Sequence, residues 1–443
     1  MIELPLLNAD QWRAQAGAER RFSIPEPDPA TAERLRSIFG REVSAVDAVR
    51  EIVDSVRRGG DAAVDGWAAR IEGVEGPRPL VTREHMAACW EGLDRGLRDA
   101  LSAAAERIRG FHELQVDTRP RGEPGMCLRP EPLRRAGCYV PGGRAAYPST
   151  VLMSVIPAQV AGVGSIAVVS PAVDSDGVHP LVAAAAHLLG VTELHAVGGA
   201  QAVAALAYGT ESIAAVDKVV GPGNLFVTLA KREVFGAVDI DQLAGPSEIL
   251  LIASEGAVPQ HVAADLVSQL EHDPLAWAVC LTDSAALADA VRAEFAERAP
   301  AAARAGIIAE SAGRHGFVVV VDSLDDAVEM AAAFAPEHLS LQGHAAEGLR
   351  ERVRGAGAVF CGDLSAVSMG DYVAGPNHTL PTQGAARYRG PLSVMDFVRW
   401  PSVVDLSAAE FDRLAPVATA LATAEGLHGH EQAIALRMEE RAR

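Results

Sequence analysis

Two side chains suited to metal binding stand three residues apart in the stretch VAADLVSQLEHDP. Gln269 and His272 occupy positions i and i+3 of an expected helix, so they share a face near its C-terminal end. An amide oxygen and an imidazole nitrogen suit a borderline divalent cation, but a complete site needs further ligands. A hydrogen-bonded pair at a helix end explains the same spacing. The nearby Asp265 is expected to be a solvated charge.

An acid–base pair follows in the stretch APEHLSL. Pro336 is expected to end a helix, which leaves Glu337 and His338 in the turn before a strand. Histidine titrates near neutrality, and burial can raise the pKa of a glutamic acid into the same range, so the pair could perform general acid–base chemistry. An exposed turn without a chemical role is the alternative interpretation.

A polar loop with the sequence SMGDYVAGPNHTLPT spans residues 368–382. It contains Asp371, Asn377 and His378 among glycines and prolines. A loop this long and polar is rarely only a connection. Two histidines together with Gln269 and Asp371 would offer a metal a mixed nitrogen and oxygen shell, for which zinc, manganese and iron are candidates.

The stretch EGLHGHEQ near the C-terminus carries further groups of this kind. Glu425, His428 and His430 lie close together within it. His428 and His430 are two residues apart, so in a helix they point in different directions. The spacing leaves open whether His428 assists His430 or lies in solvent.

Three glycine-rich turns could bind a dinucleotide. No complete GxGxxG follows a strand, but turns begin at Tyr139 (YVPGG), Val197 (VGGAQAV) and Val220 (VGPGNLF). Glycines let a ligand approach the backbone, and free N–H groups at the start of the next helix attract a pyrophosphate. Each turn alone could be only a tight connection. Three in succession favour a nucleotide or another anionic ligand.

Buried apolar strands alternate with helices from residue 137 onward. Strand SIAVVS, helix AQAVAALAYG and strand EILLIA are examples. This alternation predicts βαβ units and mostly parallel sheets, so we expect an α/β protein with two doubly wound lobes. In such sheets ligands bind beyond the carboxyl ends of the strands, where we expect the polar loops to lie.

Composition excludes several classes of protein. The chain has 443 residues, a formal charge of −19 and no run of basic residues, so we expect no nucleic-acid or membrane partner. The apolar runs are too short to span a bilayer, and the first residues do not resemble a signal peptide. The five cysteines include no CxxC and favour free thiols in a reducing cytoplasm.

Lysine and asparagine are unusually rare. Lys218 and Lys231 are the only lysines in the sequence, and only three asparagines occur, including Asn224 and Asn377. Sites that keep these residues against so strong a bias could require them. Lys218, Asn224 and Lys231 lie close together in the sequence and are therefore additional candidates.

The chain resembles the histidinol dehydrogenase family over about residues 30–440. The matching stretches, in the order of the family, are GCYVPGGRAAYPSTVLM, VGGAQAVAALAYGTES, VDKVVGPGNLFVTLAKR, AGPSEILLIA, DLVSQLEHDP, APEHLSL, GDYVAGPNHTLPT, PLSVMDF and AEGLHGH. One stretch departs from the pattern. Before Asp371 the sequence reads DLSAVSMG, where the family usually has a Thr-Pro-Glu-type sequence.

The resemblance implies a zinc-dependent enzyme of histidine biosynthesis that oxidises L-histidinol to L-histidine through L-histidinaldehyde and reduces two NAD. By motif, the metal ligands would be Gln269, His272, Asp371 and His430. His338 would be the base that removes the hydroxyl proton, and Glu337 would activate water for the aldehyde step. The substrate contacts would be Ser247, Gln269, His272, His338, Asp371, Glu425 and His430.

The resemblance also implies the cofactor contacts and the assembly. Tyr139, Gln201 and Asn224 would face NAD. The family is a homodimer in which the tail completes the neighbour's site, so Glu425 and His430 would lie in the partner's pocket. The implied fold is a pair of incomplete Rossmann-like lobes related to aldehyde dehydrogenases. Alternatives are a paralogous metal- and NAD-dependent dehydrogenase of another polar primary alcohol, and a non-catalytic binding protein.

Four parts of the chain are expected from these patterns together. We expect an N-terminal arm over residues 1–27 and a C-terminal dimerisation tail over residues 389–443. The metal and catalytic residues would lie on a first α/β domain of residues 28–137 and 248–388. The NAD side would lie on a second α/β domain of residues 138–247.

Overall fold

The chain forms two compact units in a computed structural model. The model describes residues 2–16, 22–25, 27–73, 76, 80–116, 121–123, 125–142, 146–174 and 177–443. The first unit consists of Met1–Gln115 and Leu133–Phe397, and the second of Val116–Pro132 and Val398–Arg443. Each unit is described by itself.

A six-stranded parallel sheet in the first unit has the order β1-β14-β13-β12-β15-β16. Its strands are β1 (Leu6–Asn8), β12 (Glu248–Ala253), β13 (Trp277–Thr282), β14 (Gly316–Val320), β15 (His338–Gln342) and β16 (Ala358–Cys361). Every residue of β12, EILLIA, is buried. A strand covered by helices on both faces reads as such a continuous apolar run.

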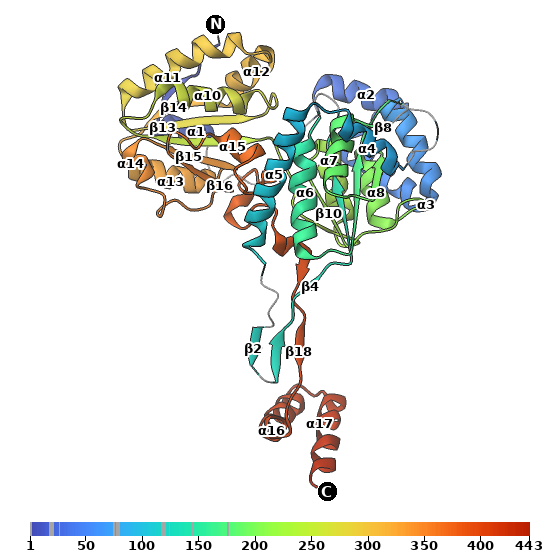
Figure 1. Cartoon of the computed structure of the whole chain (residues 1–443). Helices are drawn as coiled ribbons and strands as arrows, with labels where there is room; N and C mark the ends of the chain where they lie inside the picture. Colours follow the sequence, from blue (N-terminus) through green and yellow to red (C-terminus); the bar gives the residue numbers. More distant parts are fainter. Residues whose placement is uncertain are drawn as a thin grey trace. The chain divides into compact units, whose positions relative to one another are not determined.

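Helices cover both faces of this sheet (Figure 1). One face is packed by α10 (Pro259–Leu270), α11 (Ala285–Arg298) and α12 (Ala305–His315). The other is packed by α1 (Ala9–Ala16), α13 (Leu324–Phe334) and α14 (His344–Glu347). The short helix α15 (Val367–Tyr372) follows β16.

The N-terminal residues join the six-stranded sheet. We expected an arm over residues 1–27, but β1 pairs with β14 in parallel, with Leu6 opposite Val318. The ring of Trp12 on α1 lies 5.8 Å from that of Phe334 on α13. One short edge strand and a buried tryptophan therefore tie this segment to the core.

A five-stranded parallel sheet in the same unit has the order β11-β10-β5-β6-β9. Its strands are β5 (Arg135–Tyr139), β6 (Ser165–Ser170), β9 (Glu193–Ala196), β10 (Lys218–Val220) and β11 (Asp239–Ile240). The hairpin strands β7 (Ala172–Asp174) and β8 (Gly177–Val178) follow β6. With the six-stranded sheet, this arrangement confirms the predicted α/β class with two parallel sheets.

Eight helices of the described residues pack on the five-stranded sheet. One core contains α2 (Pro29–Phe39), α3 (Ala45–Glu72), α8 (Gly199–Tyr208) and α9 (Leu225–Val234). The other contains α4 (Arg83–Glu91), α5 (Arg95–Glu113), α6 (Pro148–Ala161) and α7 (Pro180–Leu188). We expected residues 28–137 to belong with the six-stranded sheet. Their helices pack on the five-stranded sheet because apolar side chains such as Val49 and Ile108 enter its two cores.

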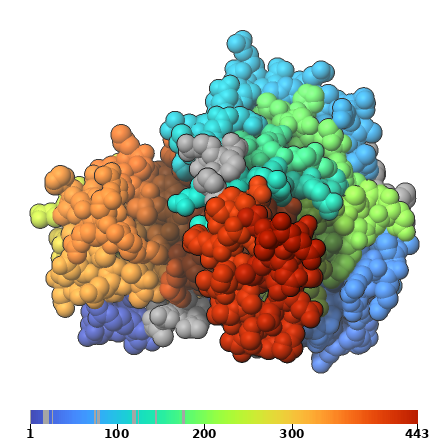
Figure 2. All heavy atoms as spheres, turned by 90° about the horizontal axis from the view of Figure 1, so that it is seen from below, coloured from blue at the N-terminus to red at the C-terminus, as the bar shows by residue number. Residues whose placement is uncertain are grey.

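The second unit combines short antiparallel strands with two helices. Its strands are β2 (Arg121–Glu123), β3 (Met126–Leu128), β4 (Glu131–Pro132), β17 (Val398–Arg399) and β18 (Ser402–Val404). Helices α16 (Ala408–Ala424) and α17 (His428–Arg441) pack side by side, as Figure 2 shows at the red end of the colour scale. Among the residues described, no helix is long and apolar enough to cross a membrane.

Candidate active site

The backbone of one residue, Glu248, contacts both members of the predicted acid–base pair. Glu337 and His338 directly precede and begin β15, which pairs with β12. The backbone N–H of Glu248 donates to Glu337 Oε2 at 2.8 Å, and the backbone carbonyl of Glu248 lies 3.0 Å from His338 Nδ1. Both side chains are buried, at 6% and 5% exposure. The alternative of an exposed turn is therefore wrong.

The hydrogen bonds and burial set the protonation states of this pair. A carbonyl oxygen only accepts, so Nδ1 of His338 carries the hydrogen and Nε2 keeps its lone pair. Burial lowers the pKa of His338, against the opposing charge of Asp371. Burial raises the pKa of Glu337 well above its ordinary value, and the charges of Glu248 and Asp371 raise it further. The imidazole of His338 is thus neutral, and the neighbouring carboxylate of Glu337, once ionised, binds a proton strongly.

The pair lies at the amino ends of the strands. Glu248 and His338 are the first residues of β12 and β15, and Gln269 lies near the C-terminal end of α10, which returns to the same edge. We expected all ligand-binding loops at the carboxyl ends. In the six-stranded sheet the candidate residues Glu248, His338 and Gln269 instead lie at the edge where β12 and β15 begin.

Two predicted metal ligands of the first unit, His272 and Asp371, lie near the acid–base pair. Asp371 and His272 both act on the pKa of His338 and on that of His378, after burial as the main cause. Nδ1 of His378 donates to the backbone carbonyl of Asp371 at 2.9 Å. Such coupling requires short distances between the charges, so the structure brings these four side chains into one region.

The amide of Gln269 has unused hydrogen-bonding capacity. Its side chain is 2% exposed, and Nε2 has no partner among the described residues. A buried amide normally satisfies both of its ends, so this nitrogen lacks an acceptor, whereas a metal ion would be held by the amide oxygen Oε1. Within the described residues no group of three His, Cys, Asp or Glu side chains is placed to hold a metal. The predicted set supplies only His272 and Asp371 of these types from this unit.

The unusual sequence before Asp371 forms a helix that presses against an aromatic ring. Residues Val367–Tyr372 make up α15, and a Cβ at Gly370 would lie 2.6 Å from the Phe360 ring. That ring lies 6.0 Å from the ring of His338. Gly370 therefore allows α15 to approach β16 closely, where the Phe360 ring packs near both α15 and the imidazole.

The predicted cofactor residues lie at the carboxyl ends of the five-stranded sheet. Tyr139 ends β5, Gln201 is in the first turn of α8, and Asn224 caps α9. The Asn224 side chain accepts hydrogen bonds from the backbone N–H groups of Phe226 and Val227, at 3.0 and 3.2 Å. Of the turn YVPGG, Gly143 lies outside the described residues.

Two N–H groups of the turn VGGAQAV donate to side chains of the chain itself. The N–H of Gly198 donates to Glu72 Oε1 at 3.2 Å, and that of Gly199 donates to the Tyr139 hydroxyl at 3.1 Å. Gln201 is fully buried and donates from Nε2 to the same Glu72 oxygen at 2.9 Å. The carboxylate of Glu72 thus binds the turn and the Gln201 side chain within the protein.

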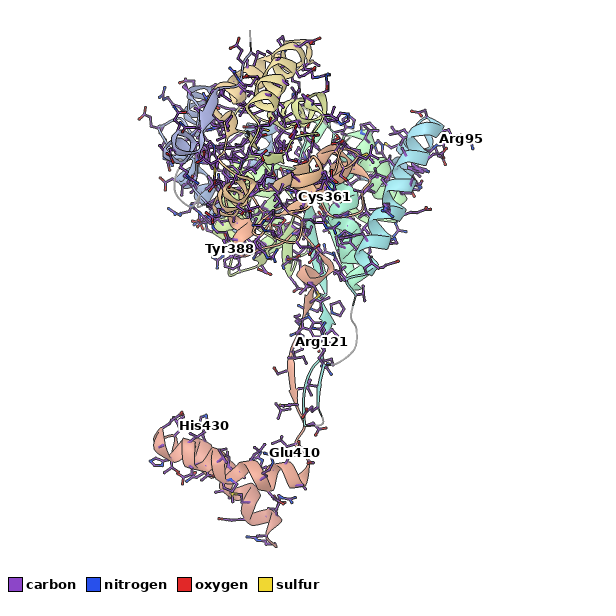
Figure 3. All side chains as sticks on the ribbon, turned by 90° about the vertical axis from the view of Figure 1, so that its left-hand side faces the viewer. Arg95, Arg121, Cys361, Tyr388, Glu410 and His430 are labelled. Carbon is purple, nitrogen blue, oxygen red and sulfur yellow. The ribbon has the colours of Figure 1, made fainter. Side chains whose placement is uncertain are left out.

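The remaining predicted residues are Ser247, Glu425 and His430. Ser247 directly precedes β12, and its backbone carbonyl accepts from the N–H of Trp277 at 3.0 Å. Glu425 and His430 belong to the second unit, where His430 lies on α17 (Figure 3). Both side chains are exposed. Their participation in a site stays a prediction.

Comparisons with known proteins agree in one family. The family model described as histidinol dehydrogenase matches residues 39–438. A histidinol dehydrogenase from Parasynechococcus marenigrum is 47% identical over 392 residues, covering 87% of this chain and 90% of the relative. One from Bacillus subtilis is 44% identical and covers 92% of this chain and 97% of the relative. The chain belongs to the histidinol dehydrogenase family.

A solved structure supports the family fold. A crystal structure of histidinol dehydrogenase from Elizabethkingia anophelis matches with a TM-score of 0.88 and 29% identity, over 100% of this chain and 99% of that one. This member of the histidinol dehydrogenase family is therefore an oxidoreductase with the fold of its relatives, as the sequence motifs predicted.

Two residues of this histidinol dehydrogenase family member were not recognised as structural partners of the site. We expected Asp265 to be solvated, but it is 7% exposed and accepts from Gln342 Nε2 at 2.9 Å. Burial raises its pKa to about 6. Asp265 precedes Gln269 by one helical turn, and this spacing could have predicted a shared inward face. No signal in the sequence pointed to Glu72.

The retained lysines are structural. Lys231 is 2% exposed and forms an ion pair with Asp241. Its Nζ donates to the Gly221 carbonyl at 3.0 Å, while Asp241 Oδ2 accepts from the Gly221 N–H at 2.8 Å. The pair therefore holds both polar groups of Gly221 in the turn that leads to Asn224. Lys218 is also buried and pairs with Asp239 at 2.8 Å.

Replacing Lys231 by methionine is expected to lower the free energy of unfolding by about 3–5 kcal/mol, because Asp241 stays buried without its cation. Urea denaturation at fixed protein concentration measures the change. Arg232→Met removes a neighbouring cation that is only partly buried and should cost far less. Equal effects of the two substitutions would contradict this role of the ion pair.

Proposed function

We propose that this chain oxidises L-histidinol to L-histidine through L-histidinaldehyde, with reduction of two NAD, as a cytoplasmic enzyme of histidine biosynthesis. The observation that carries the proposal is the buried Glu337–His338 pair bound to the backbone N–H and carbonyl of Glu248, in a chain of this family. It supplies a neutral base and a second, differently tuned group beside one reaction centre.

His338 and Glu337 take separate steps. In the first oxidation, Nε2 of His338 removes the proton of the substrate hydroxyl while hydride leaves the carbon. In the second, the ionised Glu337 removes a proton from the water that attacks the aldehyde, and hydride leaves again. The hydrogen bond from Nδ1 to Glu248 keeps the imidazole oriented after Nε2 becomes protonated.

The cofactors fit the residues present. A divalent cation such as zinc would be held by Gln269, His272, Asp371 and His430, and when bound it would anchor the imidazole and amine of the substrate. The amide oxygen of the buried Gln269, the imidazoles and the carboxylate of this set include no thiolate, and they suit a borderline metal with nitrogen and oxygen ligands. NAD, when bound beside Tyr139, Gln201 and Asn224, would accept the hydride.

Substrate recognition and assembly complete the proposal. Ser247 and Glu425 contact the substrate, and a second copy of the chain supplies Glu425 and His430 to each site. Exposed apolar side chains on the C-terminal helices support a homodimer. They include Val417, Leu421, Leu427 and Leu436, and none of the α17 side chains is buried. A contact with another copy would remove this surface from water.

The direct test is turnover of L-histidinol together with metal content. We expect two NADH per L-histidinol, about one zinc per subunit, loss of activity with a chelator and recovery with added zinc. A Gln269→Ala variant should bind the metal more weakly. Metal- and NAD-dependent oxidation of another alcohol, with no NADH from L-histidinol, would identify a paralogue instead. No turnover of any alcohol would favour a binding protein.

A further inference from the structure

The face of β15 that packs on α10 is polar along its whole length. Side chains alternate along a strand, so His338, Ser340 and Gln342 point to one side of the sheet. All three are buried, at 5%, 1% and 2% exposure. Their partners on β12 belong to the apolar core that α10 covers; these are Ile249, Leu251 and Ala253. The three polar residues, here called the polar strip of β15, thus interrupt an apolar interface and begin at the candidate base.

One carboxylate of α10 faces the polar strip of β15. Asp265 is 7% exposed, and its Oδ2 accepts from Gln342 Nε2 at 2.9 Å. The same nitrogen lies 3.3 Å from Ser340 Oγ. The backbone N–H of Val367, the first residue of α15, donates a further hydrogen bond to the carboxylate. Asp265 therefore joins α10, β15 and α15 at one buried point.

Each of these three elements carries a residue of the candidate site. Gln269 follows Asp265 by about one turn of α10. Asp371 follows Val367 by about one turn of α15, and His338 begins β15. A shift or rotation of any one element would therefore move its site residue relative to the other two. A metal site tolerates little such movement, because its ligands must keep their distances and angles.

Stability alone does not explain a carboxylate at this position. Burial raises the pKa of Asp265 to about 6, against the hydrogen bond from Gln342 and the charge of His261, which lower it. The ionised form thus loses free energy on burial that an apolar side chain would not lose. Val262 and Leu266 of the same helix pack into the core without this cost. An orienting role accounts for the polar contacts, since a buried hydrogen-bond network fixes one arrangement of the elements that it joins.

We propose that Asp265 is a positioning residue that holds α10, β15 and α15 in the arrangement that a metal ion requires. It acts through Gln342 and Val367, and it touches neither the metal nor the substrate. The inference rests on the proposed function, in which Gln269 and Asp371 help to hold the cation.

Two quantities measured on the same full-length variants test the inference: zinc affinity, from competition with a chelator, and the free energy of unfolding of the metal-free protein. Asp265→Leu should bind zinc at least about tenfold more weakly, as expected for a residue that orients metal ligands. It should also be less stable, because Gln342 Nε2 stays buried without its acceptor.

A second substitution separates positioning from stability. Combining Asp265→Leu with Gln342→Met removes both polar partners, so most of the lost stability should return. The zinc affinity should stay low, because the apolar pair no longer fixes the three elements. Asp265→Asn keeps an oxygen for the Val367 N–H and can bond to the Gln342 amide, so it should bind zinc nearly as tightly as the wild type.

Another amide–carboxylate contact of α10 provides the control. Glu294 on α11 accepts from Gln260 Nε2 at 2.7 Å, at the opposite end of α10 from Gln269. Glu294→Leu should leave the zinc affinity unchanged. Zinc affinity that recovers with stability in the double variant, or that is unchanged in Asp265→Leu, would overturn the inference. A wild-type chain that binds no zinc would instead contradict the proposed function.

Discussion

Asparagine in place of His338 is expected to lower the turnover of L-histidinol by about 10²- to 10⁴-fold, the usual contribution of a general base. The asparagine amide can still donate to the Glu248 carbonyl, which His338 Nδ1 contacts at 3.0 Å, so the strand should keep its structure. It has no basic nitrogen in place of Nε2. Pre-steady-state formation of NADH from L-histidinol measures the loss in the first oxidation.

Glu337→Gln is the matched variant for this experiment. Its side-chain oxygen can still accept from the Glu248 N–H, but it cannot remove a proton from water. The first oxidation should continue while the second stops, giving one NADH and an aldehyde that a carbonyl reagent traps. Identical behaviour of the two variants, with both steps slowed equally, would contradict the separate roles assigned to the pair.

The pH below which each oxidation slows should depend on the pKa of the side chain that acts as its base. Burial lowers the pKa of His338, so its base form persists to lower pH than in a free histidine, and the first oxidation should slow only below that range. Burial raises the pKa of Glu337, so its base form is present only at higher pH than in a free glutamate. As the pH falls, the second oxidation should therefore begin to slow at a pH above the range in which a free glutamic acid titrates.

Local sequence patterns predicted the parallel sheets and the chemistry-bearing turns. The run EILLIA is β12, and SIAVVS is β6, because a strand covered on both faces must be apolar throughout. Pro336 and its neighbours correctly predicted that the acid–base pair directly follows a helix. These features depend only on residues close together in the chain.

Long-range packing could not be predicted in the same way. Apolar spacing in α3 shows that one face is buried, but it does not identify the sheet, and α3 packs on α8 and α9. Likewise, the general rule for parallel sheets places ligand-binding loops at the carboxyl ends of the strands, whereas His338 begins its strand and Gln269 lies near the end of the helix that returns to that edge. The carboxylate of Glu72 reaches its turn from a helix 126 residues earlier in the chain than Gly198.

Two inactive variants are expected to restore activity when combined in one dimer. His338→Asn removes the base from the first unit, and His430→Ala removes a predicted metal ligand from α17 of the second. In a hybrid dimer with exchanged tails, one site carries both changes and the other carries neither. A hybrid isolated through two affinity tags should therefore have about half the activity of the wild-type dimer.

The result distinguishes a shared site from a site completed within one chain. If each tail served its own subunit, both sites of the hybrid would carry one damaging change and the hybrid would stay inactive. His428→Ala is the control, because His428 is also exposed on α17, 3.6 Å from Glu431, and has no assigned role. It should be active alone. Metal content checks the ligand role of His430 and not the exchange of tails: the hybrid should hold about one zinc per dimer in either arrangement, since one of its two sites lacks His430.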